Sequence, residues 1–526
     1  MQLGRRVLCS KSLSSRLKSI PGEIMQRAVR TSRLARNLAL LCAGFAIGLP
    51  VAAGAADFAQ VYQDALASDP TYQQAYATYM AAREARPEAW ASLLPQISGT
   101  AGKSWDHNAG EQTQIESVSA TQLAPEPFYL NSSTAAKQWS LNLSEELFSW
   151  TDWMNLKAAD SQVAEAQATY ESAAQDLILR VATAYFNVLS ALDTLQAQES
   201  SLQAFDLQLE QADKRYQVGL IAITDVEQAR AGRDTAAAAV IADKQLLATA
   251  EDQLQVITGR QYPTLSEPGA GMPLLMPSPA NQNQWVQTSL EQNLSLIASR
   301  LAADVARNNV QVAFGGHLPS ISLTASRSFN SSTQDESIVG LGTFNGLPAW
   351  TNDRQIGLEI SVPIFSGGGT EARVHQAQYQ WIAAKDAVQQ AARSTEQQAR
   401  DAYLGVISGI AHVQALQQAL VSSQTAYRAT EAGYRVGTQT EVDVLNALST
   451  LVQAKTNYAA SRYAYITSVV QLRFAAGTLD PGEVQAINRW LKASESISLG
   501  AITPEALTPP APPPTPNPPP PPPLNP

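Results

Sequence analysis

The sequence predicts a mainly α-helical protein with a β-barrel portion, to which each chain contributes four strands. Two stretches of about sixty residues, 151–214 and 370–432, contain no proline and few glycines, as long helices require. A pair of segments with alternating apolar and polar residues precedes each stretch. This arrangement occurs twice along the chain.

The chain begins with a predicted signal peptide, residues 1–56. Its first 37 residues hold nine Lys or Arg against one acid, Glu23, and the apolar stretch 38–56 ends in small residues. This order favours cleavage near residue 56. A membrane anchor is the alternative, since nineteen residues can span a bilayer, but Pro50 and the Ala/Gly-rich end disfavour it.

Cleavage changes the charge and the cysteine content. The leader carries +8, so a whole-chain charge of −10 leaves −18 on the remainder, which disfavours nucleic acid as a partner. Cys9 and Cys42 both lie in the leader, so no disulfide is expected in the mature protein. The leucine before Cys42 disfavours lipidation. Because the basic region is long, Met25 is an alternative start to Met1.

The remainder contains an internal duplication. Residues 94–98 (Leu-Pro-Gln-Ile-Ser) recur as 318–322 (Leu-Pro-Ser-Ile-Ser) at an offset of 224, and residues 216–219 recur as 434–437 at an offset of 218. Blocks that keep their order and nearly one offset indicate structural repeats. Each repeat has the predicted order helix, strand, strand, long helix, helix. The predicted boundaries are 57–283 for the first repeat, 284–486 for the second, and 487–526 for an extension with a disordered, Pro-rich tail.

The four strands are predicted as segments of roughly ten residues, with Ile97 and Ile321 among the apolar positions of two of them. Their alternation is typical of transmembrane strands, although a soluble sheet is an alternative. Aromatic residues lie near the predicted strand ends, as at membrane interfaces: Trp139, Phe148, Trp150, Trp153 and Phe365. No transmembrane helix is expected after residue 57. Four strands cannot enclose a pore, so closure in lipid requires several chains, and three would supply twelve strands.

The long helices favour the barrel interpretation. At ~1.5 Å per residue each predicted stretch is roughly 90–95 Å long, far beyond an ordinary globular helix. Helices of this length must bury their apolar residues against long neighbours.

Three further blocks carry a resemblance to a known family: residues 218–226 (Val-Gly-Leu-Ile-Ala-Ile-Thr-Asp-Val), 257–263 (Ile-Thr-Gly-Arg-Gln-Tyr-Pro) and 432–438 (Ala-Gly-Tyr-Arg-Val-Gly-Thr). They resemble the TolC family, from about residue 57 to 486. The resemblance implies a homotrimer whose twelve-stranded barrel lies in the outer membrane and continues into a long periplasmic α-helical barrel. It implies a passive exit duct for multidrug efflux, type I protein secretion or both. The implied partners are a periplasmic adaptor (membrane fusion) protein, an inner-membrane efflux pump or ABC transporter, and outer-membrane lipid.

The resemblance also implies a gate. The family closes its periplasmic end with two acids one helical turn apart, at positions that match Asp443 and Asn446, of which only the first is acidic here. Three Asp443 carboxylates in a trimer would repel one another, attract cations and raise one another's pKa values. We therefore expect a weaker cation block than two acidic rings give. The alternative is a helix-start acid, next to Thr438 and Glu441 at capping-box spacing.

In the family, contacts between the hairpins hold the closed state, and we call them the latch. They map onto Thr224, Asp225 and Tyr434. A basic partner in the family corresponds to Gln439 here, and this change weakens that part of the latch. The block from Thr224 could instead be an ordinary helix start. The hairpin turns are expected to dock the adaptor, or to be turns without a partner. The docking residues implied are Arg215, Val218, Gly219, Gly433, Arg435, Val436 and Gly437.

No catalytic constellation, metal site or cofactor is expected. The four histidines share no metal-ligand spacing, and the glycines at 367–369 lack the continuation of a phosphate-binding loop. The Pro-rich end is predicted to be extended and to pack no core. A soluble periplasmic coiled-coil scaffold is the alternative to the duct.

Overall fold

The computed structural model describes residues 55–119, 122–269, 272–338 and 342–498, without the side chains of 112–128, 130 and 492–498. Residues 1–54 of the predicted signal peptide and the Pro-rich tail from residue 499 lie outside the described residues.

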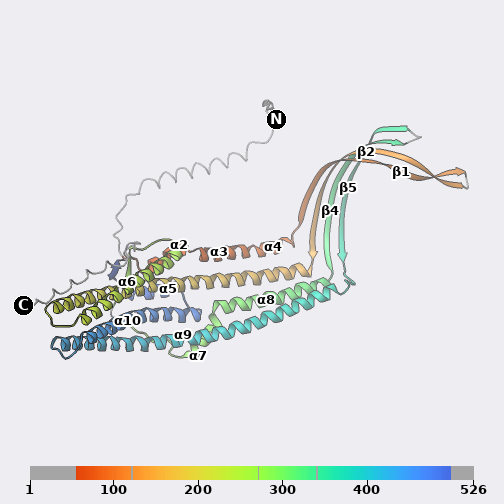
Figure 1. Ribbon diagram of the computed structural model, residues 1–526. Helices are drawn as coiled ribbons and strands as arrows, with labels where there is room; N and C mark the ends of the chain where they lie inside the picture. Colours follow the sequence, from red (N-terminus) through yellow and green to blue (C-terminus); the bar gives the residue numbers. More distant parts are fainter. Residues whose placement is uncertain (1–54, 120–121, 270–271, 339–341, 499–526) are drawn as a thin grey trace, which may run out of the picture. The chain divides into compact units, whose positions relative to one another are not determined.

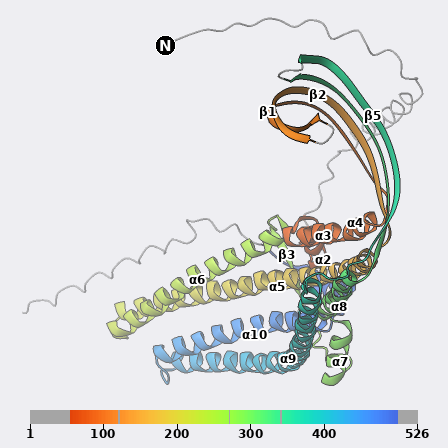
Figure 2. The same cartoon turned by 90° about the vertical axis from the view of Figure 1, so that its right-hand side faces the viewer.

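Two long helical hairpins dominate the described chain: α5 (Trp150–Gln217) with α6 (Ile223–Thr258), and α9 (Gly369–Arg435) with α10 (Glu441–Ala475). The helices of each hairpin pack on one another, and α10 also packs on α5, so the hairpins lie side by side (Figures 1 and 2). The long helices predicted over 151–214 and 370–432 are confirmed.

One window of α9 is long and apolar enough to cross a membrane, with a mean hydropathy of 1.3, whereas no such segment was expected. By length and composition alone this is weak evidence for a span. Only 17% of the window is buried within the chain, although α9 contacts α7 (Gln282–Gln292), α8 (Leu294–Phe314) and α10. The window therefore leaves apolar surface uncovered in one chain.

The helical stretch expected over 57–93 is divided into three helices: α2 (Phe58–Ser68), α3 (Pro70–Arg83) and α4 (Ala85–Ala91). Asp69 separates the first two, because its carboxylate accepts the backbone N–H of Tyr72 at 2.9 Å and Pro70 occupies the first turn of α3. Asn293 separates α7 from α8 in a similar way, because its side-chain oxygen accepts a hydrogen bond from the backbone N–H of Leu296. A 3₁₀ turn, η1 (Gly315–His317), follows α8.

The large sheet contains four antiparallel strands in the order β1-β2-β4-β5: β1 (Gln96–Ser119), β2 (Gln122–Phe148), β4 (Ser320–Ile338) and β5 (Gly342–Ser361). Their lengths of 24, 27, 19 and 20 residues are about twice the expected ten. The apolar alternation revealed only part of each strand, because the hydrogen-bonded ladder continues through polar sequence. Within this sheet, β1 and β5 are the edge strands.

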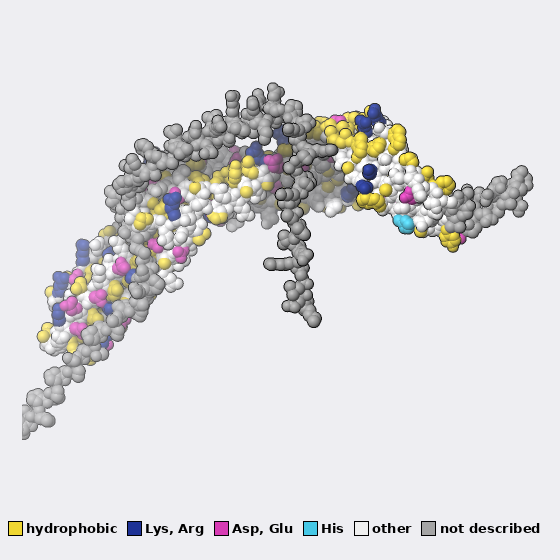
Figure 3. All heavy atoms as spheres, turned by 90° about the horizontal axis from the view of Figure 1, so that it is seen from above, with side chains coloured by type: hydrophobic (Ala, Val, Ile, Leu, Met, Phe, Trp, Pro, Cys, Tyr) yellow, Lys and Arg dark blue, Asp and Glu magenta, His cyan; other side chains and the backbone are white. Residues whose placement is uncertain are grey.

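A row of apolar residues crosses all four strands. The register aligns Ile97 with Leu143, Leu143 with Ala325, and Ala325 with Ile356. Directly paired residues point to the same face of a sheet, so this row lies on one face. Ile97 is 67% exposed and Ile356 is 82% exposed. Figure 3 shows hydrophobic side chains gathered on the sheet, and acidic and basic ones scattered over the helical hairpins.

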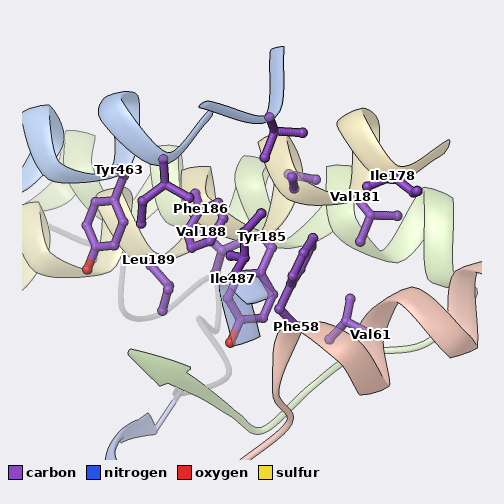
Figure 4. Close-up of a cluster of buried hydrophobic side chains, with 14 of the residues drawn as sticks. Phe58, Val61, Ile178, Val181, Tyr185, Phe186, Val188, Leu189, Tyr463 and Ile487 are labelled. Atoms are coloured by element: carbon purple, nitrogen blue, oxygen red, sulfur yellow. The ribbon is translucent and has the colours of Figure 1, made fainter. Parts of the chain in front are cut away.

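The central core, by which we mean the largest cluster of buried apolar residues, lies where α2, α5, α10 and α11 (Pro481–Asn488) meet (Figure 4). Its aromatic centre contains Phe58, Tyr185 and Phe186, with ring centroids 5.3–5.9 Å apart. The buried Tyr185 hydroxyl donates to the carbonyl of Ser266 at 2.7 Å. Ser266 belongs to β3 (Thr264–Pro268), which pairs with β6 (Leu491–Ser498), so part of the expected C-terminal extension forms a small sheet beside the core.

Candidate functional site at the hairpin tips

The hairpin tips, residues 209–229 and 431–446, contain two turns built in the same way. Gly219 has φ of 74° and Gly437 has φ of 80°, a conformation that glycine adopts without steric cost. The N–H of Leu220 donates to the carbonyl of Arg215, and the N–H of Thr438 donates to that of Gly433, both at 2.9 Å.

These turns present apolar side chains to solvent. Val218 is 69% exposed, Leu220 is 70% exposed and Val436 is 76% exposed. Arg435, beside Val436, pairs with Glu431 through a 2.5 Å contact between Arg435 Nη2 and Glu431 Oε1. The tips thus offer aliphatic side chains flanked by charge, which is the kind of surface expected for docking.

Asp443 lies at the start of α10 in a capping box. Its carboxylate accepts the backbone N–H and the hydroxyl of Thr440, at 2.9 Å and 2.7 Å, and its own N–H donates to the Thr440 hydroxyl at 3.3 Å. These bonds hold the pKa of Asp443 below its usual range. Thr438 and Glu441 had the same spacing, but they form no capping box. Asn446 is exposed one turn further along α10.

A cross-hairpin contact joins the two tips. The Arg215 guanidinium at the end of α5 lies over the ring of Tyr434 near the end of α9, 4.8 Å from its centroid. The Tyr434 hydroxyl is hydrogen-bonded to the Glu441 carboxylate. Burial and the bond to Glu441 raise the pKa of Tyr434 to about 12. Asp225, at the start of α6, is near enough to act electrostatically on Glu441.

The residues predicted for the latch are thus partly brought together. Tyr434 and Asp225 both interact with Glu441. Thr224 is exposed, and Gln439 packs at Gly433, where an added Cβ would lie 2.8 Å from Gln439 Cγ. Sequence reasoning placed Arg215 only among the docking residues. It considered Glu441 only as a possible cap. The apolar residues three and four positions later, Val444 and Leu445, could have indicated that Glu441 lies on the buried face of α10.

Small apolar clusters lie beneath this contact. One contains Leu209, Ala212, Val226 and Ala229, all from α5 and α6. The other joins the hairpins, since Phe205 and Ala236 pack with residues of α10: Leu445, Leu448 and Val452. Contacts between the tips therefore depend on few apolar residues and one polar cluster.

Outside the hairpin tips, two of the histidines lie close to the same carboxylate, that of Glu371. Nε2 of His317 lies 3.6 Å from Glu371, and Nε2 of His375 lies 3.0 Å from the same carboxylate. All three side chains are at least 40% exposed. Within the described part of the chain, no group of histidine, cysteine or acidic residues has the geometry of a metal site.

Comparison with known proteins gives this geometry a context. The chain matches the family "Outer membrane efflux protein" over residues 61–260 and 285–478. It is 34% identical to outer membrane protein TolC of Vibrio cholerae over 447 residues, which cover 85% of this chain and 96% of that protein. It is 26% identical to the alkaline protease secretion protein AprF of Pseudomonas aeruginosa over 430 residues, which cover 81% of this chain and 85% of that protein.

A solved structure shares the fold. The crystal structure of CusC aligns with a TM-score of 0.64 at 20% identity and covers 82% of this chain and 95% of that one. The fold class predicted from the sequence, a TolC-like architecture of sheet and long helices, is confirmed. The chain belongs to the outer membrane efflux protein family, and it is an outer-membrane duct for efflux or secretion that extends into the periplasm.

Proposed function

We propose that three copies of this chain form one duct, which is closed at rest by the hairpin tips. The four strands of each copy join edge to edge into a twelve-stranded barrel in the outer membrane, and the long helices form a barrel in the periplasm. A periplasmic adaptor docks on the turns around Gly219 and Gly437, and an inner-membrane pump or ABC transporter delivers the substrate. Docking separates the tips and opens the duct. Because the family is one of channels, the coarse assignment is to a transporter and not to an enzyme.

The observation that carries this proposal is the four-stranded sheet with two edge strands and an exposed apolar face. In hydrocarbon each unpaired backbone group costs several kcal/mol, so a four-stranded sheet is not stable there alone. The aligned row from Ile97 to Ile356 fits a surface in contact with lipid. Closure by identical copies pairs β1 of one chain with β5 of the next. The uncovered apolar window of α9 supports the same assembly.

For the cargo, we propose that one duct serves both small-molecule efflux and protein secretion. The family description names efflux, and the related AprF is named for secretion of alkaline protease. A strain that lacks this chain is then expected to become sensitive to toxic compounds and also to lose secreted proteins from the medium. Loss of only one of these activities would restrict the cargo to that class.

The assembly is tested by cross-linking at the sheet edges. Residues 57–526 contain no cysteine, so introduced cysteines are unique. Thr100→Cys on β1 together with Gln355→Cys on β5 is expected to give covalent dimers and trimers with a flexible bis-maleimide in outer membranes, and no larger species. As a matched control, Ser140→Cys with Ser328→Cys, which face each other on the paired central strands, is expected to react only within one chain.

Conductance of the purified protein completes the test. We expect a detergent-solubilised trimer that conducts ions across planar lipid bilayers. A water-soluble single chain that forms no conducting pore would refute the proposal and favour the periplasmic scaffold.

A further inference from the structure

Glu441 is an unusual residue for a tip surface, because its carboxylate is buried. The side chain belongs to the first residue of α10, and the residue is 5% exposed. Asp69 is the other acidic residue with this degree of burial in the described chain. The two carboxylates differ in how well they are compensated.

The Asp69 carboxylate has hydrogen-bond donors for both of its oxygens. It accepts two hydrogen bonds from Arg180, at 2.8 Å and 3.2 Å, and one from the N–H of Tyr72. Glu441 has a bond from the Tyr434 phenol, and its Oε1 is buried without a hydrogen-bond partner. A buried acceptor without a partner loses its hydration and gains nothing in exchange.

The charged groups around Glu441 have opposite effects on its carboxylate. The Arg215 guanidinium attracts the carboxylate, but it lies over the Tyr434 ring, and Asp225 repels it. These groups come from the elements packed around it, α5, α9 and α6, and on its own helix Asp443 bonds to Thr440. Burial is the largest effect and raises the pKa of Glu441. The charged form is therefore less stable in this contact than it would be in water.

From this geometry we infer that Glu441 is a gating residue, whose buried and incompletely bonded carboxylate weakens the contact between the hairpins so that the tips can separate. This inference rests on the proposed opening of the duct. Separation exposes the carboxylate to water and relieves its desolvation, which favours the open tip. An apolar or neutral side chain here would hold the hairpins together more tightly, as replacement of buried charges by well-packed neutral groups often does.

A favourable interaction with the helix N-terminus does not account for the position. An acid in the first turn gains from the helix dipole whether or not it is buried, and Asp443 occupies the same turn while it is more exposed than Glu441. The position of Glu441 against Tyr434 and Arg215 removes water from its carboxylate without improving its interaction with the helix dipole. The role of Glu441 is therefore in the cross-hairpin contact.

The experiment compares the full-length protein with Glu441→Gln, which keeps the shape and the acceptor for Tyr434 but removes the charge. Amide hydrogen exchange of the tip segments is expected to slow several-fold at neutral pH, because the glutamine carries no charge that loses its hydration when the tips close. Bilayer conductance of the variant is expected to fall. Glu441→Leu is expected to act in the same direction, and Glu441→Asp, which retains the charge, to preserve fast exchange.

A pH profile separates this role from a merely structural one. Because the closed contact binds the Glu441 proton more tightly than a separated tip does, acidification should tighten the wild-type tip, and Glu441→Gln should lose this response. Glu210→Gln is the matched control, since Glu210 is an exposed α5 glutamate bonded to Lys214, and it should retain the wild-type exchange and pH profile.

Unchanged or faster exchange in Glu441→Gln would overturn the inference, whatever the conductance. Slower exchange in Glu441→Gln, together with a wild-type protein that fails to conduct, would instead refute the proposed duct and leave the weakening effect of Glu441 established.

Discussion

The central core and the hairpin tips are built from the same long helices, yet they are held together differently. In the central core, Tyr185 and Phe186 are at most 1% exposed and pack among other aromatic rings. At the tips, the apolar clusters are small, and the remaining contact includes an imperfectly bonded carboxylate. Since dense apolar burial supplies most folding stability, the helices are fixed at the core and only loosely joined at the tips. The proposed gate requires this difference.

The largest expected effect is in the central core. Phe186→Ala removes a ring that contacts Phe58, Tyr185 and Tyr463, and should lower the free energy of unfolding by about 3–5 kcal/mol. Denaturant unfolding of the detergent-solubilised protein measures this. The matched control is Phe205→Ala beneath the tips, where fewer apolar neighbours predict a smaller loss. An equal loss at both positions would contradict the distinction between the two regions.

A smaller effect is expected from Asp69→Asn at the edge of the central core. Burial alone would raise the pKa of Asp69, but the bonds from Arg180 and Tyr72 outweigh it and lower the pKa. The folded pKa is thus below the unfolded value of about 3.9, so the stabilisation is present above that pH and disappears as the pH falls through the folded pKa. The variant should lose about 1.5–3 kcal/mol at pH 7 and lose progressively less in acid. Equal losses at pH 7 and pH 3 would show that the charge is not responsible.

The smallest effect on the free energy of unfolding is expected at the tips, where a substitution should instead change conductance. Asp443→Ala removes a partly exposed carboxylate and should leave the unfolding transition of the central core unchanged, while it increases conductance or reduces inhibition by divalent cations. Asn446→Asp is the opposite variant, which should strengthen cation inhibition by adding a second acidic position. If neither variant alters conductance or cation sensitivity in planar bilayers, Asp443 is not part of the gate.

Periodic patterns were the most reliable guide in the sequence. The two long helices and the turns at Gly219 and Gly437 were predicted close to their observed positions, because a segment without proline can sustain a helix and glycine suits the turn that follows it. Strand lengths were underestimated, since β1 continues to Ser119 through polar residues that show no alternation. The division of 57–93 was missed because Asp69 was not considered as a cap.

Family resemblance located the tip residues but not their partners. Asp225 and Tyr434 were both mapped onto the contacts of the closed state, and the structure places Tyr434 against Glu441 and Arg215. Glu441 is the first residue of α10, where an acid is ordinarily exposed and favoured by the helix dipole. Nothing in its local sequence shows that α5 from the other hairpin covers it.

The sequence by itself determined the elements and their order, because hydrophobic period, proline, glycine and capping residues act over a few neighbouring positions. Only the tertiary structure decided which side chains meet across the hairpins, how far the strand ladders extend, and which carboxylates are compensated. These properties depend on contacts between residues that are not sequence neighbours, such as Asp69 and Arg180, or Arg215 and Tyr434, which are more than 200 positions apart. A local pattern does not show which distant residues meet, so the contacts between the hairpin tips become visible only once the helices have packed.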